Sequence, residues 1–180
     1  MPEEPESEAE VAKLVAAIEA GTDGIVVPEE MLVEPENESA AAPRSLYAEI
    51  LTMKVGQKIK LALRGNHDAR MILIRDSSKL IRRFVMLNPR ITDNEVIAVA
   101  RNKSADDELI RMITERRDWM RNYQVRLALT TNPKTALPLA LRQLGSLDDR
   151  DVRHIAKSKN VPQAVAAHAR RILFAQQGQK

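Results

Sequence analysis

Apolar residues recur every three or four positions along most of the chain, which is the spacing of one face of an α-helix. The first such stretch consists of Val11, Leu14, Val15 and Ile18. It is preceded at Ser7 by a Ser-x-x-Glu capping box and followed by Gly21, a typical helix stop. The pattern predicts a short amphipathic helix over about residues 8–20, which is too short to be stable alone.

From residue 45 to residue 177 the same spacing continues through short helices with brief connections. Good N-cap residues precede most of these stretches. The predicted helix starts are Ser45, Asn66, Ser78, Thr92, Ser104, Thr135 and Asp148. Three further helices follow from periodicity, at about 54–64, 119–131 and 162–175. Because no alternating strand pattern competes, we expect an all-α protein.

A five-residue pattern repeats along the chain at spacings of 22 and 44 residues: an apolar residue, a base, any residue, then two apolar residues. The recurring bases are Lys60, Arg82, Arg126 and Arg170. Two copies run into the turns Asn88-Pro89 and Asn132-Pro133. Asn tolerates a left-handed backbone at a helix end and Pro cannot continue a helix, so these turns are expected to be structural. A period of 44 residues and a looser one of about 27 both remain open.

The Asn-Pro-x-Thr turns, together with Asp-Ala-Arg at 68–70 and Asp-Val-Arg at 151–153, resemble those of HEAT-type and leucine-rich-repeat-variant α-solenoids. The resemblance covers about residues 45–177, and the whole pattern is also similar to a group of uncharacterised bacterial helical-repeat proteins. It implies a short right-handed α-solenoid of HEAT- or armadillo-like repeats that bury a shared apolar stripe. Such a fold implies a binding surface rather than a chemistry.

Charge is distributed unevenly along the chain. Residues 1–44 hold twelve acidic and two basic residues, a net charge of −10, whereas residues 45–180 carry +13. We expect residues 1–44 to form an acidic, mostly disordered arm with a flexible linker at 34–44, and residues 45–177 to form the repeat domain. The asymmetry favours an acidic or polyanionic partner; alternatively, the arm only solubilises and screens the basic body.

The basic residues divide into two groups by their position relative to the apolar stripe. The recurring bases lie at its edge, where we expect them to pack between helices and pair with Asp; alternatively they form a ladder that meets phosphates or carboxylates. The candidate basic face consists of Arg83, Arg111, Arg116, Arg117, Arg121 and Arg171. Trp119 and Tyr123 lie near it, either stacking a base or, four residues apart on one helix, packing in the core.

The motifs of common enzymes are missing from the sequence. There is no cysteine, no His-Glu-x-x-His, no Gly-x-Ser-x-Gly and no phosphate-binding glycine loop. The acidic clusters at 106–108 and 148–151 fall in first helical turns, where acids favour the helix dipole. We therefore expect no catalytic residue, metal or cofactor.

The N-terminus has no signal-peptide pattern and no apolar run is long enough to span a bilayer, so a cytoplasmic location is expected. The expected function is a non-enzymatic scaffold that binds an acidic protein partner through its basic face. The alternative is a module that binds nucleic-acid backbone without reading bases. The oligomeric state stays open.

Overall fold

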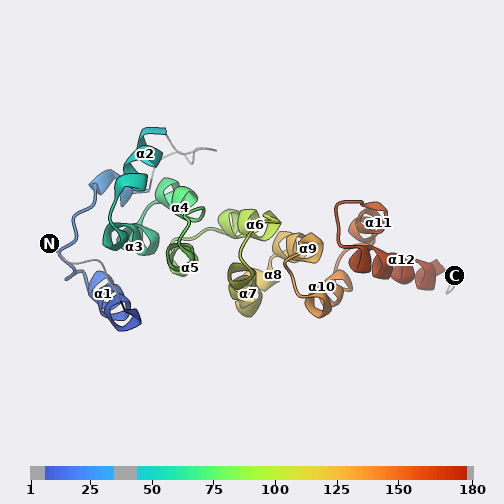
Figure 1. Ribbon diagram of the computed structural model, residues 1–180. Coiled ribbons are helices and arrows are strands. Elements are labelled where there is room, and N and C mark those ends of the chain that lie inside the picture. Colours follow the sequence, from blue (N-terminus) through green and yellow to red (C-terminus); the bar gives the residue numbers. More distant parts are fainter. Residues whose placement is uncertain (1–6, 35–43, 178–180) are drawn as a thin grey trace. The chain divides into compact units, whose positions relative to one another are not determined.

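The computed structural model describes residues 7–34 and 44–177 of the chain. All regular structure in these residues is helical, and none of them forms a strand (Figure 1). The expectation of an all-α protein is therefore confirmed. The chain divides into two compact units, Met1–Ile91 and Thr92–Lys180. No helix in the described part of the chain is long and apolar enough to cross a membrane.

The first unit contains five α-helices and one 3-10 turn within its described residues. They are α1 (Glu8–Ala20), η1 (Glu29–Met31), α2 (Arg44–Thr52), α3 (Val55–Arg64), α4 (His67–Leu73) and α5 (Lys79–Leu87). The described helices of the second unit are α6 (Asp93–Arg101), α7 (Asp107–Glu115), α8 (Arg117–Arg121), α9 (Tyr123–Thr131), α10 (Leu137–Leu144), α11 (Asp149–Lys157) and α12 (Gln163–Gln177).

Local capping signals place several helix ends where the sequence predicts them. Ser7 and Thr92 each form a complete capping box with a Glu three residues later. The side chain of Asn66 accepts a hydrogen bond from the amide of Ala69 at the start of α4. Gly21 ends α1 in the left-handed conformation, at a φ of 73°. These ends are predictable because the cap and the group that it satisfies are only a few residues apart.

Two predicted helix starts are one or two residues early because an Asn turn delays each helix. After α6, the Oδ1 atom of Asn102 accepts a hydrogen bond from the amide of Ser104, so the N-cap of α7 is Asp106. After α9, the main-chain carbonyl of Asn132 likewise accepts from the amide of Thr135, and α10 begins only at Leu137. The N-cap residue therefore comes after the Asn turn and is not the first Ser or Thr that follows the preceding helix.

The helix predicted at 119–131 is in fact two helices. Asn122 has an extended backbone, and its side chain accepts a hydrogen bond from the amide of Gln124. Trp119 thus belongs to the short α8 and Tyr123 begins α9. The expectation that these two rings share one helix face is wrong, because Asn122 interrupts the helix between them.

Part of the acidic N-terminal segment is packed into the core of the first unit. Ile18 and Met31 have no exposed surface, and Ile25 is also buried in this cluster. The amine of Lys60 donates to the carboxylate of Asp23 at 2.8 Å, which fastens this segment to α3. The short helix predicted over about residues 8–20 is present as α1. The expectation of a mostly disordered arm fails for residues 21–34, because their few apolar residues cover the apolar faces of the helices that follow. Most of the predicted linker at 34–44 lies outside the described residues.

In each unit the Asn of an Asn-Pro turn donates to two carbonyls at the end of a neighbouring helix. Asn88 is 1 % exposed, and its Nδ2 atom donates to the carbonyl oxygens of Ala62 and Gly65, at 3.0 and 3.3 Å, at the end of α3. Asn132 is 2 % exposed and its Nδ2 atom donates to those of Ala100 and Asn102, at 2.7 and 3.0 Å, at the end of α6. Each side chain thus satisfies carbonyls that a helix end leaves open.

The reason expected for these asparagines is not the one that the structure shows. Neither Asn88 nor Asn132 adopts the left-handed conformation, and no described non-glycine residue has a positive φ. Their amide groups matter because they donate two hydrogen bonds to a neighbouring helix. Pro89 and Pro133, which follow them, are exposed and lie outside any helix.

Three of the recurring bases bond to another segment, and the fourth packs against a ring on its own helix. Lys60 pairs with Asp23, and the guanidinium of Arg170 donates to the carbonyl of Ala156 at 2.8 Å. The guanidinium of Arg82 donates to the main-chain carbonyl of Asp76. Arg126 lies against the ring of Tyr123, with its guanidinium carbon 5.7 Å from the ring centre.

Candidate functional site

Four residues of the candidate basic face lie on α7 and α8 and the junction between them. Arg111 and Arg121 are exposed, and each has an acidic neighbour on its own helix. The Arg111–Glu115 and Arg121–Asp118 nitrogen–oxygen distances are 3.8 and 3.5 Å. Because each of these cations has a carboxylate one turn away, this region is a surface of mixed charge rather than a continuous basic stripe.

The two aromatic residues near this cluster are used inside the fold. Trp119 is 6 % exposed, and the guanidinium of Arg116 lies 4.4 Å above its ring centre. The hydroxyl of Tyr123 donates to the carboxylate of Asp151 and accepts a hydrogen bond from the amide of Asp148. Burial and the bond to Asp151 raise the pKa of Tyr123 above its usual value. These contacts favour a packing role over stacking of nucleic-acid bases.

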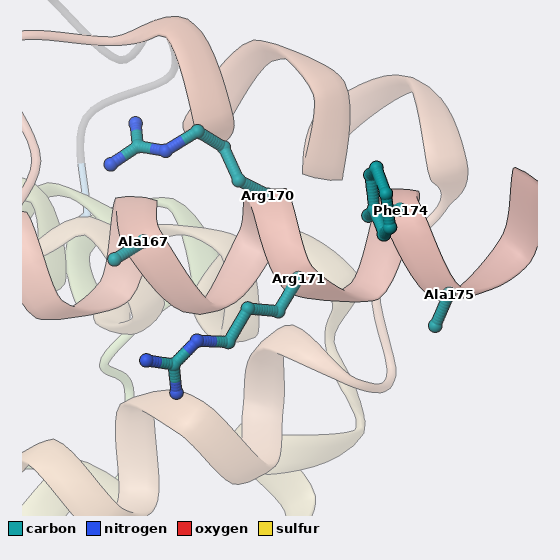
Figure 2. A pocket seen from close by; sticks show the side chains of 5 residues that line it. All are labelled: Ala167, Arg170, Arg171, Phe174 and Ala175. Carbon is teal, nitrogen blue, oxygen red and sulfur yellow. The ribbon is translucent and has the colours of Figure 1, made fainter.

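The other two candidate residues are on separate helices. Arg83 is exposed on α5 of the first unit. Arg171 is exposed on α12 of the second unit, where it lines a shallow hollow of about 460 Å³ with Arg170 and Phe174. Figure 2 shows both guanidinium groups extending back along α12 toward Ala167, away from the Phe174 ring. Phe174 is 80 % exposed, so this hollow combines one bare aromatic ring with two cations.

A second candidate hollow lies in the second unit, between α9 and α11. This hollow of about 390 Å³, hereafter the α9/α11 groove, is formed by parts of the chain far apart in the sequence. Its apolar lining consists of Leu127, Ala128, Ile155 and Val161. Its polar lining includes Arg101, Lys103, Thr131, Asp151, His154, Ser158 and Asn160.

The rim of the α9/α11 groove is held by side-chain bonds to other segments. The amine of Lys103 donates to the carbonyl oxygen of Asn160 at 2.9 Å, which joins the α6–α7 connection to the α11–α12 connection. The guanidinium of Arg101 donates to the side-chain oxygen of Gln124 at 2.9 Å. Both bases remain exposed at their surface, so each retains donor capacity for a ligand.

The chemistry of the groove suits a ligand with both apolar and acidic groups. Leu127 and Val161 are half-buried, so their remaining apolar surface is available for burial against a ligand. The lining offers two cations, Arg101 and Lys103, against the one carboxylate of Asp151, which already accepts a hydrogen bond from Tyr123. None of the groove residues was a binding candidate from the sequence. No short motif links residues 101–103 to 158–161, because only the tertiary fold brings them together.

The acidic clusters noted in the sequence have local partners or local roles. Asp106 and Asp148 are the N-cap residues of α7 and α11, and Asp149 lies 3.8 Å from Arg153 on its own helix. Within the described residues no group of three His, Asp or Glu side chains is arranged to hold a metal ion.

Comparison of the chain with protein-family models, with curated proteins and with solved structures gave no match.

Proposed function

We propose that this chain is a non-catalytic helical-repeat scaffold that binds an acidic segment of a protein partner in the α9/α11 groove. One observation carries the proposal: the groove is lined by buried or half-buried apolar side chains, here called its floor, and by the exposed cations Arg101 and Lys103, here called its rim. A peptide that places a Leu-sized side chain on the floor and carboxylates at the rim would use both parts of the groove.

The same features weigh against nucleic acid as the ligand. A phosphate backbone binds mainly through cations and gains little from an apolar floor. The exposed cations Arg111 and Arg121 each have a carboxylate within one helical turn. Trp119, the largest aromatic side chain, is buried beneath Arg116. We therefore expect duplex DNA to bind this chain more weakly than an acidic, apolar peptide does.

We further propose that the helices stack as a short right-handed solenoid of HEAT-like repeats. The support is that α5 packs on α3, and α9 on α6, with a buried Asn closing each pair through the same two-carbonyl contact. The interval between these asparagines is 44 residues, the longer of the two periods found in the sequence. Repeats of this kind present an extended surface to their partners.

The binding proposal is tested with a labelled synthetic peptide of alternating Leu and Glu and the full chain. Lys103→Glu reverses a rim charge, and we expect it to weaken binding about tenfold, a change of about 1.4 kcal/mol. The matched control is Lys79→Glu, which makes the same charge change at an exposed position on α5. It should bind as the unaltered chain does.

Two further probes separate a groove from a general attraction between charges. A peptide with Ser in place of every Leu should bind much more weakly if the apolar floor takes part. Fluorescence anisotropy of both peptides at two salt concentrations measures the electrostatic contribution to the binding free energy, which falls as the salt concentration rises. The proposal would be refuted if Lys103→Glu and Lys79→Glu weakened binding equally. It would also be refuted if duplex DNA bound more tightly than the Leu/Glu peptide and this binding were lost in Arg121→Ala.

A further inference from the structure

The segment Pro28–Glu34 of the first unit is held by side chains in the manner of a bound peptide. The Nδ2 atom of Asn66 donates to the carbonyl oxygens of Glu30 and Val33, at 2.8 and 3.0 Å. The main-chain amide of Asn66 donates to the carbonyl of Met31 at 2.7 Å. These bonds recognise the backbone of the segment and do not depend on its side chains at those positions.

A pair of arginines completes the contacts at the end of this segment. The guanidinium of Arg90 donates to the carbonyl of Leu32 at 2.8 Å, so four successive carbonyls are bound. The carboxylate of Glu34 accepts one hydrogen bond from Arg70 and one from the amide of His67, both at 2.7 Å. Arg90 also lies 3.7 Å from this carboxylate.

Two side chains of the segment, those of Met31 and Glu34, have the most specific surroundings, while Leu32 is partly buried against the core. Met31 is fully buried in the core of the unit, and three residues later Glu34 meets two guanidinium groups. By contrast, Glu29, Glu30 and Val33 are exposed. The site thus binds a segment that has an apolar side chain and, three positions later, a carboxylate.

The receptor side of this contact is built to hold an anion. The side chain of Arg70 is 1 % exposed and also donates to the carbonyl of Gly65 at 3.0 Å, which fixes its direction. Burial raises the pKa of Glu34. The hydrogen bonds from Arg70 and His67 and the positive charges of Arg70 and Arg90 together lower it by more, so the pKa lies below its usual value. The ionised form is therefore the one that the site prefers.

We propose that Asn66, Arg70 and Arg90 form a second peptide-binding site, occupied in cis by Pro28–Glu34, that takes a partner segment of the same chemistry in trans. The partner segment carries an apolar residue followed, three positions later, by Asp or Glu. The chain's own segment competes with it at the high effective concentration of a tethered ligand. This site is separate from the α9/α11 groove, so either proposal can fail without the other.

The test uses the full chain and a labelled peptide with the sequence of residues 28–34. The peptide is acetylated at its N-terminus and amidated at its C-terminus. Glu34→Gln weakens the cis contact without altering the receptor residues. We expect the peptide to bind this variant at least tenfold more tightly than the unaltered chain. Glu29→Gln, in the same segment but exposed, is the matched control and should leave the affinity unchanged. A peptide with Gln for its last Glu should bind weakly to both.

Two measurements keep the outcome unambiguous. The amide resonance of His67, which donates to Glu34, should shift in the Glu34→Gln chain and return when the peptide is added. Arg90→Ala combined with Glu34→Gln should abolish the gained affinity. The proposal is overturned if Glu34→Gln does not raise the affinity, or if affinity survives Arg90→Ala. It is also overturned if sedimentation shows that the variant dimerises and excludes the peptide, because the occupant is then a second copy.

Discussion

Replacing Asn132 should destabilise the second unit more than almost any other polar substitution, because its side chain makes three hydrogen bonds while nearly fully buried. Its Nδ2 atom donates to the carbonyls of Ala100 and Asn102, and its Oδ1 atom accepts from the amide of Lys134 at 2.8 Å. The carbonyl of Ala100 belongs to a residue with no exposed surface. Removing the Asn132 side chain therefore leaves the carbonyl of Ala100 without its side-chain donor at a position buried from solvent.

The size of the effect follows from these bonds. Each contributes about 1 kcal/mol net, so Asn132→Ala should lower the free energy of unfolding by about 3 kcal/mol. Asn132→Asp should be at least as destabilising, because it keeps the acceptor for Lys134 but places a carboxylate against two carbonyl oxygens. Asn94→Ala, on the exposed side of α6, is the control and should change stability by less than about 0.5 kcal/mol.

Urea unfolding followed by circular dichroism measures all three variants against the unaltered chain. The comparison of Ala with Asp at position 132 is decisive. If Asn132 acted only through the backbone conformation of its turn, Asp would replace it well, since both residues favour turns. A nearly neutral Asn132→Asp, with Asn132→Ala costing under about 1 kcal/mol, would refute the account of the repeated turns.

Three further outcomes are expected. Arg117→Ala should leave the melting temperature within about 1 °C, because its side chain is exposed; an early melt would mean that the face of α8 is misassigned. Tyr123→Phe should lose about 1–2 kcal/mol of stability in urea, because the bond to Asp151 disappears; a neutral result would mean that this bond contributes nothing. The pKa of Glu34 is lowered by folding, so its stabilisation is present above about pH 4.3 and is lost as pH falls through the folded-state pKa. The stability gap between the unaltered chain and Glu34→Gln should thus shrink in acid, and a gap that widens in acid would contradict this.

Much of the secondary structure is predictable because its signals are local. The capping boxes at Ser7 and Thr92 and the cap at Asn66 each involve residues only three positions apart. The break at Asn122 was missed because the apolar spacing on its two sides is continuous enough to suggest one helix. Only its own side-chain bond to Gln124 marks the start of α9.

Features that depend on contacts between residues far apart in the sequence could not be predicted from sequence patterns. Acidic composition suggested disorder for residues 21–34, yet apolar side chains such as Ile25 and Met31 are buried in the core of the first unit. The repeated asparagines were recognised, but their bonds to carbonyls about 30 residues away could not be. The α9/α11 groove was not anticipated for the same reason, since Lys103 and Asn160 meet only in the folded chain.

The most direct test of the proposed function is to map where an acidic, apolar peptide binds. Amide spectra of the isotope-labelled chain are recorded while the alternating Leu and Glu peptide is added. The account predicts shifts concentrated at the lining of the α9/α11 groove, with Leu127, Ile155 and Val161 among the residues most affected. Shifts confined to the exposed arginines of α7 and α8, or no saturable shifts in the groove, would contradict it.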